Sequence, residues 1–194
     1  MNRFYIIRHG ETENNRAGRL SGWIDTPLTA DGLVPTARAV AKLHSVQVAA
    51  VVSSDLGRAF VTAYTAARQL GFAGEIMRLP GLREVNYGVA ANMPKTEAYS
   101  RYPGLDQATD YTPPEGESLG HMQKRVVETL NTLNEKYNDA DILVVAHSGV
   151  MAALHASFTG GDFGEYNFRN EYPHDLVLRV TLDGGRVASF DEVG

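Results

Sequence analysis

The sequence predicts an α/β fold: a mostly parallel sheet with helices on both faces and an antiparallel edge at the C-terminus. Short runs of large apolar residues without alternation are typical of strands buried on both faces; they lie at 4–8, 48–53 and 142–146. Segments with helical spacing separate these runs, which favours right-handed crossovers between parallel strands. The chain ends in two further strand-like runs around Asp183-Gly184-Gly185, which indicates a hairpin.

The first strand, 4–8, is followed by a polar, Gly-rich segment over 11–28 that we expect to be a loop. Thr29 is a residue type that caps helices, and apolar spacing predicts a helix through 37–43. Pro35 indicates that this helix either starts late or bends.

The second strand, 48–53, ends in Ser53-Ser54-Asp55, which are residue types that cap helices. Helical spacing then runs over 56–70, and Gly71 is the expected stop. Residues 75–79 predict a weak strand.

The segment 80–116 shows little periodicity and is rich in Pro and Gly. We expect a cap insertion, about 85–116, that covers one end of the core within a single domain spanning 1–194. A long amphipathic helix is predicted over 119–137, and a strand and helix over 142–158.

Composition limits the possible functions. The net charge is 18 − 23 = −5, so nothing indicates a nucleic-acid partner or an anionic membrane surface. The absence of cysteine excludes disulfides, thiol nucleophiles and cysteine-ligated metals, and fits a cytoplasmic protein. The apolar run at 4–7 is too short for a signal peptide or a membrane helix. We expect a soluble, cytoplasmic protein, and the sequence does not indicate its oligomeric state.

Three of the predicted strands end in polar residues. The first strand ends in Arg8-His9, and the third is followed by His147-Ser148-Gly149. The second ends in Ser53-Ser54-Asp55, with Arg58 one helical turn further on. Parallel strands bring their carboxyl ends to one edge of the sheet, where ligands bind in such folds. Two histidines, two arginines and the amides of a helix start would bind a compact dianion, and phosphate is the obvious candidate.

The same residues suggest a reaction. A neutral imidazole is a competent nucleophile toward phosphorus, and guanidinium groups stabilise charge on the oxygens of the transferred group. Glu84 opens the insertion and is the candidate acid for the leaving oxygen, because a partly desolvated Glu keeps its proton to higher pH. The remaining histidines have no motif context and receive no role: His44, His121, His155 and His174.

Six blocks of residues, in order along the chain, resemble the histidine phosphatase superfamily, also called phosphoglycerate-mutase-like. The blocks are Arg8-His9-Gly10-Glu11-Thr12 with Asn15, Asp25-Thr26-Pro27-Leu28-Thr29 with Gly32, Ser53-Ser54-Asp55-Leu56 with Arg58-Ala59, Leu82-Arg83-Glu84 with Gly88, Gly116-Glu117-Ser118, and Val144-Val145-Ala146-His147. They span residues 4 to about 158, which makes the resemblance specific.

The resemblance implies that His9 is phosphorylated in turnover, that Arg8, Arg58 and His147 bind the phosphoryl group, and that Glu84 donates the proton. It also implies a hydrogen bond from Asn15, a three-layer α/β/α sandwich with an inserted cap, and no metal or other cofactor. Candidate substrate-binding residues beside Asn15 are Tyr87, Lys95 and Ser148. Tyr87 is equally compatible with packing, whereas Ser148 is better explained as orienting the backbone.

The leading hypothesis is a phosphatase for a small phosphorylated metabolite. A cofactor-dependent phosphoglycerate mutase is the nearest alternative. Between 85 and 123 the chain supplies only Lys95, where mutases have a substrate-binding lysine, and Arg101, without the adjacent arginine pair of the mutases. Gly149 stands where the mutases have Asn, and Ala90-Ala91-Asn92 replaces an aromatic-acidic-glycine element.

A third hypothesis is a silent module that only binds phosphate or a phosphoprotein. The presence of both nucleophile and acid argues against it.

Overall fold

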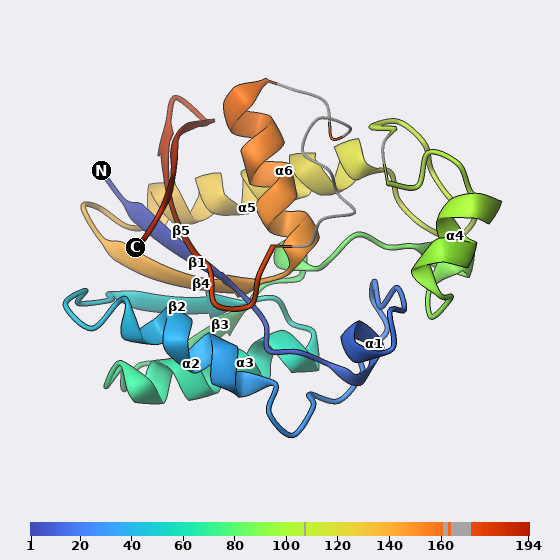
Figure 1. The fold of residues 1–194 in the computed structure, drawn as a ribbon. Coiled ribbons are helices and arrows are strands. Elements are labelled where there is room, and N and C mark those ends of the chain that lie inside the picture. The colour runs from blue at the N-terminus through green and yellow to red at the C-terminus, as the bar shows by residue number, and fades with distance from the viewer. Residues whose placement is uncertain (107, 161–162, 164–171) are drawn as a thin grey trace.

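The computed structural model describes residues 1–106, 108–160, 163 and 172–194. Its centre is one six-stranded sheet with the order β3-β2-β4-β1-β5-β6 (Figure 1). The strands are β1 (Arg3–Arg8), β2 (Ala50–Ser53), β3 (Ile76–Arg78), β4 (Asp141–Ala146), β5 (Val177–Asp183) and β6 (Arg186–Glu192). The first four are mutually parallel, whereas β5 runs antiparallel to β1 and β6 antiparallel to β5. The predicted fold class is therefore confirmed.

Helices cover both faces of the sheet. They are α1 (Glu13–Arg16), α2 (Leu33–Ala41), α3 (Gly57–Gln69), α4 (Lys95–Arg101), α5 (Leu119–Lys136) and α6 (Ser148–Thr159), with 3-10 turns η1 (Pro80–Leu82) and η2 (Gly88–Ala90). Figure 1 shows α2 and α3 below the sheet, α5 and α6 above it, and α1 with α4 beyond one end.

Alternate residues of the central strands enter two separate cores. Tyr5 and Ile7 of β1 pack with the α2–α3 layer, whereas Phe4 and Ile6 pack with the α5–α6 layer. Side chains alternate across a strand, so a strand covered on both faces must be apolar at every position. This explains the unbroken apolar runs in the sequence and gives a three-layer sandwich.

The register of the sheet aligns the carboxyl ends of its central strands. Arg8 pairs with Ala146, and the pairing continues as the His9 N–H donates to the Ala146 carbonyl at 2.9 Å. On the other side of β4, Ser54 N donates to Val145 O at 2.9 Å. The residues that follow β1, β2 and β4 therefore lie side by side at one edge.

Two local predictions in this part of the chain are corrected. Thr29 does not cap the following helix, because α2 starts at Leu33 with Gly32 at the N-cap, and the Thr29 hydroxyl instead donates to Glu11 Oε1 at 2.8 Å. Pro35 neither delays nor bends α2, since it occupies the first turn, where a missing N–H leaves no helix bond unmade.

The segment 11–28 is not entirely loop. It contains the short helix α1, which Thr12 and Asn15 close at its N-terminus as a capping box. Backbone bonds then join this segment to the predicted cap: Asn92 N donates to Leu20 O at 2.6 Å, and Lys95 N to Gly18 O at 2.9 Å. The two irregular segments thus form one structure beyond the carboxyl ends of the strands.

The C-terminal hairpin is confirmed. Gly184 and Gly185 both have positive φ, 53° and 80°, which the tight turn between β5 and β6 requires.

Within the described residues, no helix is both long and apolar enough to cross a membrane.

Candidate active site

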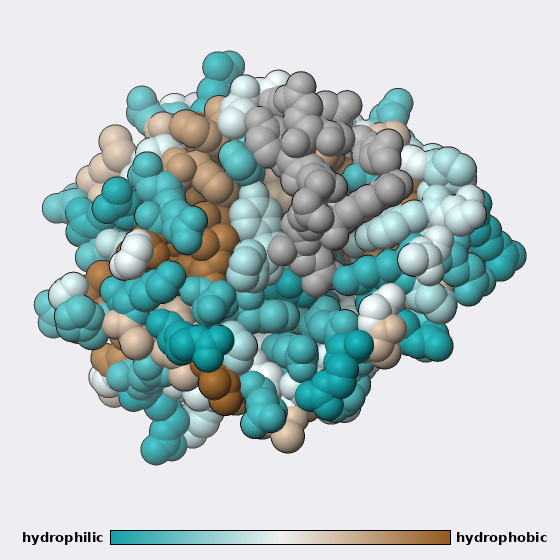
Figure 2. Space-filling view, in the orientation of Figure 1, coloured by the Kyte–Doolittle hydropathy of each residue, from teal (hydrophilic) through white to brown (hydrophobic). Residues whose placement is uncertain are grey.

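A polar pocket opens where the strands end and the two irregular segments meet. Its lining comes from four parts of the chain: Arg8, His9, Asn15, Arg19, Leu20, Ser21, Gly22, Arg58, Glu84, Tyr87 and Lys95. Figure 2 shows that the surface over α1 and α4, on the right of the view, is mainly hydrophilic.

His9 is buried beside this pocket, and its contacts fix which ring nitrogen carries the proton. Nδ1 lies 2.7 Å from the Gly10 carbonyl oxygen, which can only accept, so Nδ1 holds the proton. Nε2 accepts from Arg58 Nε at 3.2 Å, so its lone pair faces the guanidinium. Burial, and then the charges of Arg58 and Arg8, lower the pKa of His9 well below its usual value. His9 is therefore a neutral imidazole whose unprotonated Nε2 accepts a hydrogen bond from Arg58.

His147 is fully buried next to His9, with the ring centroids 5.1 Å apart. Its Nδ1 lies 3.4 Å from Arg58 Nη2, which can only donate, so in the neutral ring Nε2 carries the proton. Among the described residues, Nε2 has no hydrogen-bond partner. Burial and Arg58 lower the pKa of His147 as well. A buried N–H of this kind is suited to donate to an anion.

Arg58 is held by main-chain carbonyls. Its Nη2 donates to Gly22 O at 2.7 Å, and Nη1 donates to Ile24 O at 3.0 Å. Carbonyl partners orient a guanidinium without neutralising its charge. The charge is shared with one carboxylate, Asp25, 3.3 Å from Nη1.

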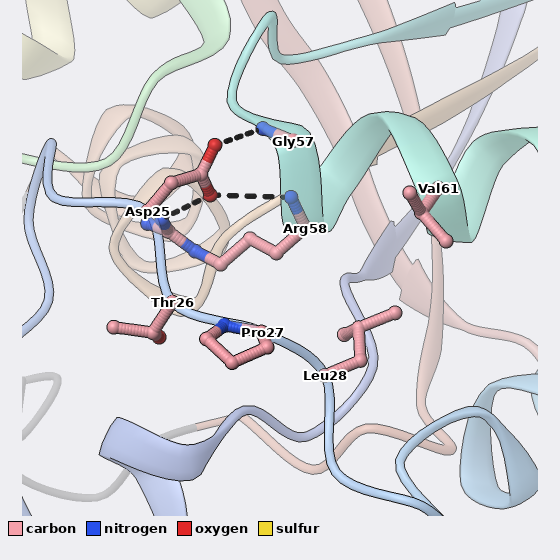
Figure 3. A pocket seen from close by; sticks show the side chains of 7 residues that line it. All are labelled: Asp25, Thr26, Pro27, Leu28, Gly57, Arg58 and Val61. Carbon is pink, nitrogen blue, oxygen red and sulfur yellow. Dashed lines mark hydrogen bonds and ion pairs between the residues drawn. The ribbon is translucent and has the colours of Figure 1, made fainter.

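Asp25 also closes the start of α3 (Figure 3). Its Oδ2 accepts from Gly57 N, and its Oδ1 accepts from Arg58 N at 3.2 Å. The N-cap residue of α3 is Leu56, whose side chain makes no cap bond, so the polar residues Ser53-Ser54-Asp55 do not cap it as predicted. The Asp25 carboxylate, which comes from a distant loop, takes the place of a local cap, and its negative charge interacts favourably with the positive end of the α3 dipole. Figure 3 shows Asp25 between the Gly57 amide and the Arg58 guanidinium, above Thr26, Pro27 and Leu28 of the same loop.

The segment 172–174, before β5, forms hydrogen bonds with residues that follow or end β1 and β4. Arg8 Nη1 donates to Tyr172 O at 2.9 Å, and Tyr172 N donates to Ser148 Oγ at 2.8 Å. Ser148, a predicted substrate-binding residue, thus orients this segment. His174 Nδ1 donates to the His9 carbonyl at 2.5 Å. Sequence reasoning gave His174 no role, because it lies far along the chain from every motif.

Glu84 lies at the mouth, half-buried. Its Oε1 accepts from Val85 N at 2.9 Å, and its Oε2 accepts from Gly149 N at 3.1 Å, in the first turn of α6. Loss of hydration raises the pKa of Glu84, although these two amides and the arginines Arg58 and Arg8 oppose the rise. The carboxyl group is therefore fixed, and it keeps its proton more readily than an exposed glutamate.

Three further predicted residues line the pocket: Asn15, Tyr87 and Lys95. The Asn15 oxygen accepts from Thr12 N at 3.1 Å, so its NH₂ group is the part that can donate to an anion. Arg19 lines the same pocket and was missed by the sequence analysis. The only signal for Arg19 was its position four residues after Asn15.

In the part of the chain that the structure describes, no group of three or more His, Asp or Glu side chains has the arrangement of a metal site. The arrangement of Arg8, Arg58 and the two histidines instead suits an anion.

Comparison with known proteins agrees with this geometry. The profile of the Histidine phosphatase superfamily (branch 1) matches residues 4–191. The chain is 35% identical to "Probable phosphoglycerate mutase GpmB" of Serratia proteamaculans over 162 residues, which are 80% of this chain and 74% of that protein. It is 31% identical to "Metal-independent phosphoserine phosphatase" of Arabidopsis thaliana, over 79% of this chain and 67% of that protein.

Among solved structures, YhfR of Bacillus stearothermophilus superposes with a TM-score of 0.85 at 27% identity, covering 96% of this chain and 94% of that chain. The chain belongs to the histidine phosphatase superfamily, branch 1.

Proposed function

We propose that this protein is a metal-independent phosphomonoester hydrolase that acts on a small phosphorylated metabolite through a phosphohistidine at His9. The observation that carries the proposal is the Nε2 lone pair of His9, held beside the Arg58 guanidinium in a pocket that also contains the Glu84 carboxyl group.

In the first step, His9 Nε2 forms a bond to phosphorus as the bond from phosphorus to the ester oxygen breaks. Glu84 gives its proton to the departing alcohol oxygen. The Nδ1–H of His9 stays bonded to the Gly10 carbonyl, which stabilises the positive charge that the ring gains on phosphorylation.

In the second step, water attacks phosphorus and gives a proton to the Glu84 carboxylate, and the bond to Nε2 breaks to release phosphate. Arg8, Arg58 and the His147 Nε2–H are suited to stabilise the phosphoryl oxygens in both steps.

The mutase alternative rests on the name of the Serratia relative, whereas the Arabidopsis relative is named as a phosphatase. A mutase must also hold the carboxylate of its substrate and protect the phosphohistidine from water. At the pocket mouth this chain supplies Arg19 and Lys95, without an adjacent arginine pair. Arg19 Nη1 donates to Asn92 O at 2.6 Å, so part of its donor capacity is used by the chain itself. These features favour hydrolysis.

Within the same proposal, the protein binds its small phosphorylated substrate and binds neither nucleic acid nor a membrane. The net charge of −5 supports this, because a negative chain does not attract polyanions or anionic lipids. The absence of cysteine supports a cytoplasmic location.

The test is turnover of a panel of phosphomonoesters in the presence of a chelator, comparing wild type with His9→Ala. We expect phosphate release and an acid-labile phosphohistidine in wild type, and neither in His9→Ala. Interconversion of 3- and 2-phosphoglycerate faster than phosphate release would establish the mutase instead. Phosphate binding without turnover or phosphohistidine would establish a binding module.

A further inference from the structure

One guanidinium binds the backbone of the loop that carries Glu84. Arg125, on α5, donates through Nη1 to Gly81 O at 3.0 Å and to Arg83 O at 2.7 Å. Its Nη2 donates to Glu84 O at 2.8 Å. Three carbonyls within four consecutive residues are thus fixed to one side chain.

Glu117 completes the set of bonds. Its carboxylate accepts from Arg125 Nε at 3.0 Å and from Nη2 at 2.6 Å, so all five guanidinium N–H groups have acceptors. Glu117 Oε1 also accepts from Asn86 N at 2.9 Å, and Glu117 N donates to Asn86 O at 3.0 Å. The pair therefore binds the chain on both sides of Glu84.

Close backbone packing supports the same loop. A Cβ atom on Gly81 would lie 1.9 Å from Thr129 Oγ1 of α5, and one on Gly88 would lie 2.0 Å from Pro114 O. Gly88 also has a φ of +52°. The loop can rest on α5 and on the segment 113–117 only because these two positions lack side chains.

We propose that Arg125 and Glu117 are positioning residues for proton transfer: they hold the Glu84 carboxyl group at the pocket mouth by fixing the backbone from 81 to 86. Neither side chain lines the pocket, so they act through Glu84 and not on the substrate. This inference rests on the proposed role of Glu84 as the acid.

The burial of the pair supports a positioning role. The Arg125 and Glu117 side chains are 16% and 8% exposed. An ion pair this buried loses much hydration and is weak evidence for net stability, whereas it specifies geometry strongly. A carboxyl group must lie within hydrogen-bond reach of the ester oxygen to act as its acid, so a small displacement of the loop lowers the rate.

The experiment compares an alkyl phosphate with p-nitrophenyl phosphate, whose leaving group departs without a proton. The variants are Arg125→Gln, Arg125→Lys and Glu117→Gln. Arg3→Gln is the matched control, since Arg3 forms an ion pair with Asp141 at 2.5 Å at the opposite end of the sheet. Thermal melting and inorganic phosphate binding by calorimetry are measured for every variant.

For Arg125→Gln we expect kcat/KM, which reports the first step and not the hydrolysis of the phosphohistidine common to both esters, to fall about 10- to 100-fold on the alkyl ester and no more than about threefold on the aryl ester. Phosphate affinity should stay near that of wild type. Arg125→Lys, which keeps the charge but not the five-donor geometry, should fall between wild type and Arg125→Gln. If Arg125→Gln unfolds, Glu117→Gln, which keeps an acceptor, provides the same comparison. In a Glu84→Gln background, Arg125→Gln should add little further loss, because its effect passes through the same carboxyl group.

An equal loss on both esters, or a full additional loss in the Glu84→Gln background, would overturn the positioning role while leaving the proposed function intact. Absence of turnover by wild type on both esters would overturn the proposed function, and this inference with it.

Discussion

The cap that Asp25 provides for α3 leads to a sharp prediction about stability. Asp25→Ala removes the acceptor for the first two amides of α3, as well as the carboxylate 3.3 Å from Arg58 Nη1. Asp25→Asn keeps one of the two acceptor oxygens, replaces the other by an NH₂ group, and removes the charge. The two variants therefore compare the loss of one acceptor and the charge with the loss of both acceptors and the charge.

The magnitude follows from the contacts. Loss of an N-cap acceptor costs about 0.5–2 kcal/mol, and loss of a charge at the helix dipole about 0.3–1 kcal/mol. The Asp25 side chain is 44% exposed, so solvent screens its ion pair with the buried Arg58, and we assign that pair the low end of the range for surface pairs, at most about 0.5 kcal/mol. We expect Asp25→Ala to lose about 1–3 kcal/mol and Asp25→Asn roughly half of that.

The assay is thermal and urea unfolding at neutral pH. For a chain of this size, 1 kcal/mol corresponds to about 2–4 °C in Tm, so Asp25→Ala should melt about 3–10 °C below wild type. Glu135→Ala, which removes one exposed negative charge from α5, is the control and should leave Tm nearly unchanged. If Asp25→Ala melted with wild type, the assignment of Asp25 as the cap of α3 would be wrong.

Three further predictions concern the pH dependence of stability, phosphate binding, and the close backbone packing at Gly88. The pKa values of His9 and His147 are lowered in the folded state, so the unfolded chain binds more protons below about pH 6.5. As the pH falls from 7 to 5, the free energy of unfolding should therefore decrease by up to about 1.4 kcal/mol per pH unit for each histidine, and Tm should fall with it. His147→Gln should flatten this slope, and an unchanged slope would show that His147 is not neutral. Inorganic phosphate at 100 times its Kd should stabilise the protein by about 2.7 kcal/mol with chelator present, and less in His147→Gln at the same concentration, measured by thermal shift. Gly88→Ala should lower the free energy of unfolding by at least about 2 kcal/mol, because the position combines a positive φ with a contact between the new Cβ and Pro114 O. Gly18→Ala, at φ +63° with no described atom near its Cβ, should lower it by only about 1 kcal/mol. Similar losses for both glycines would contradict the close packing at Gly88.

The sequence was sufficient to predict the sheet and the residues at its carboxyl edge. Strands covered on both faces require unbroken apolar runs, and polar residues directly after such runs must lie at the edge. Arg8, His9 and His147 were identified in this way, and their meeting follows from parallel pairing. Arg58 required only one more step, since it is the second residue of α3, the helix that follows β2.

Contacts between distant segments were beyond such reasoning. The cap of α3 comes from Asp25, which is 32 residues away from Gly57 in the chain, so the nearer Ser53-Ser54-Asp55 misled the prediction. Thr29 does not cap α2, because its hydroxyl donates to the Glu11 carboxylate instead. His174 and Arg125 reach the site through backbone carbonyls, and a carbonyl acceptor leaves no trace in the amino-acid sequence.

The carboxyl ends of β1 and β4 are aligned by the pairing of Arg8 with Ala146, and this alignment limits how the protein can change in evolution. The distance between the two active-site rings is fixed by the spacing of neighbouring strands, about 4.8 Å, and not by any loop. The residues at the pocket mouth, by contrast, come from irregular segments that tolerate insertions and replacements. Replacements at the mouth can therefore change what the pocket accepts while the His9 and His147 rings keep their separation.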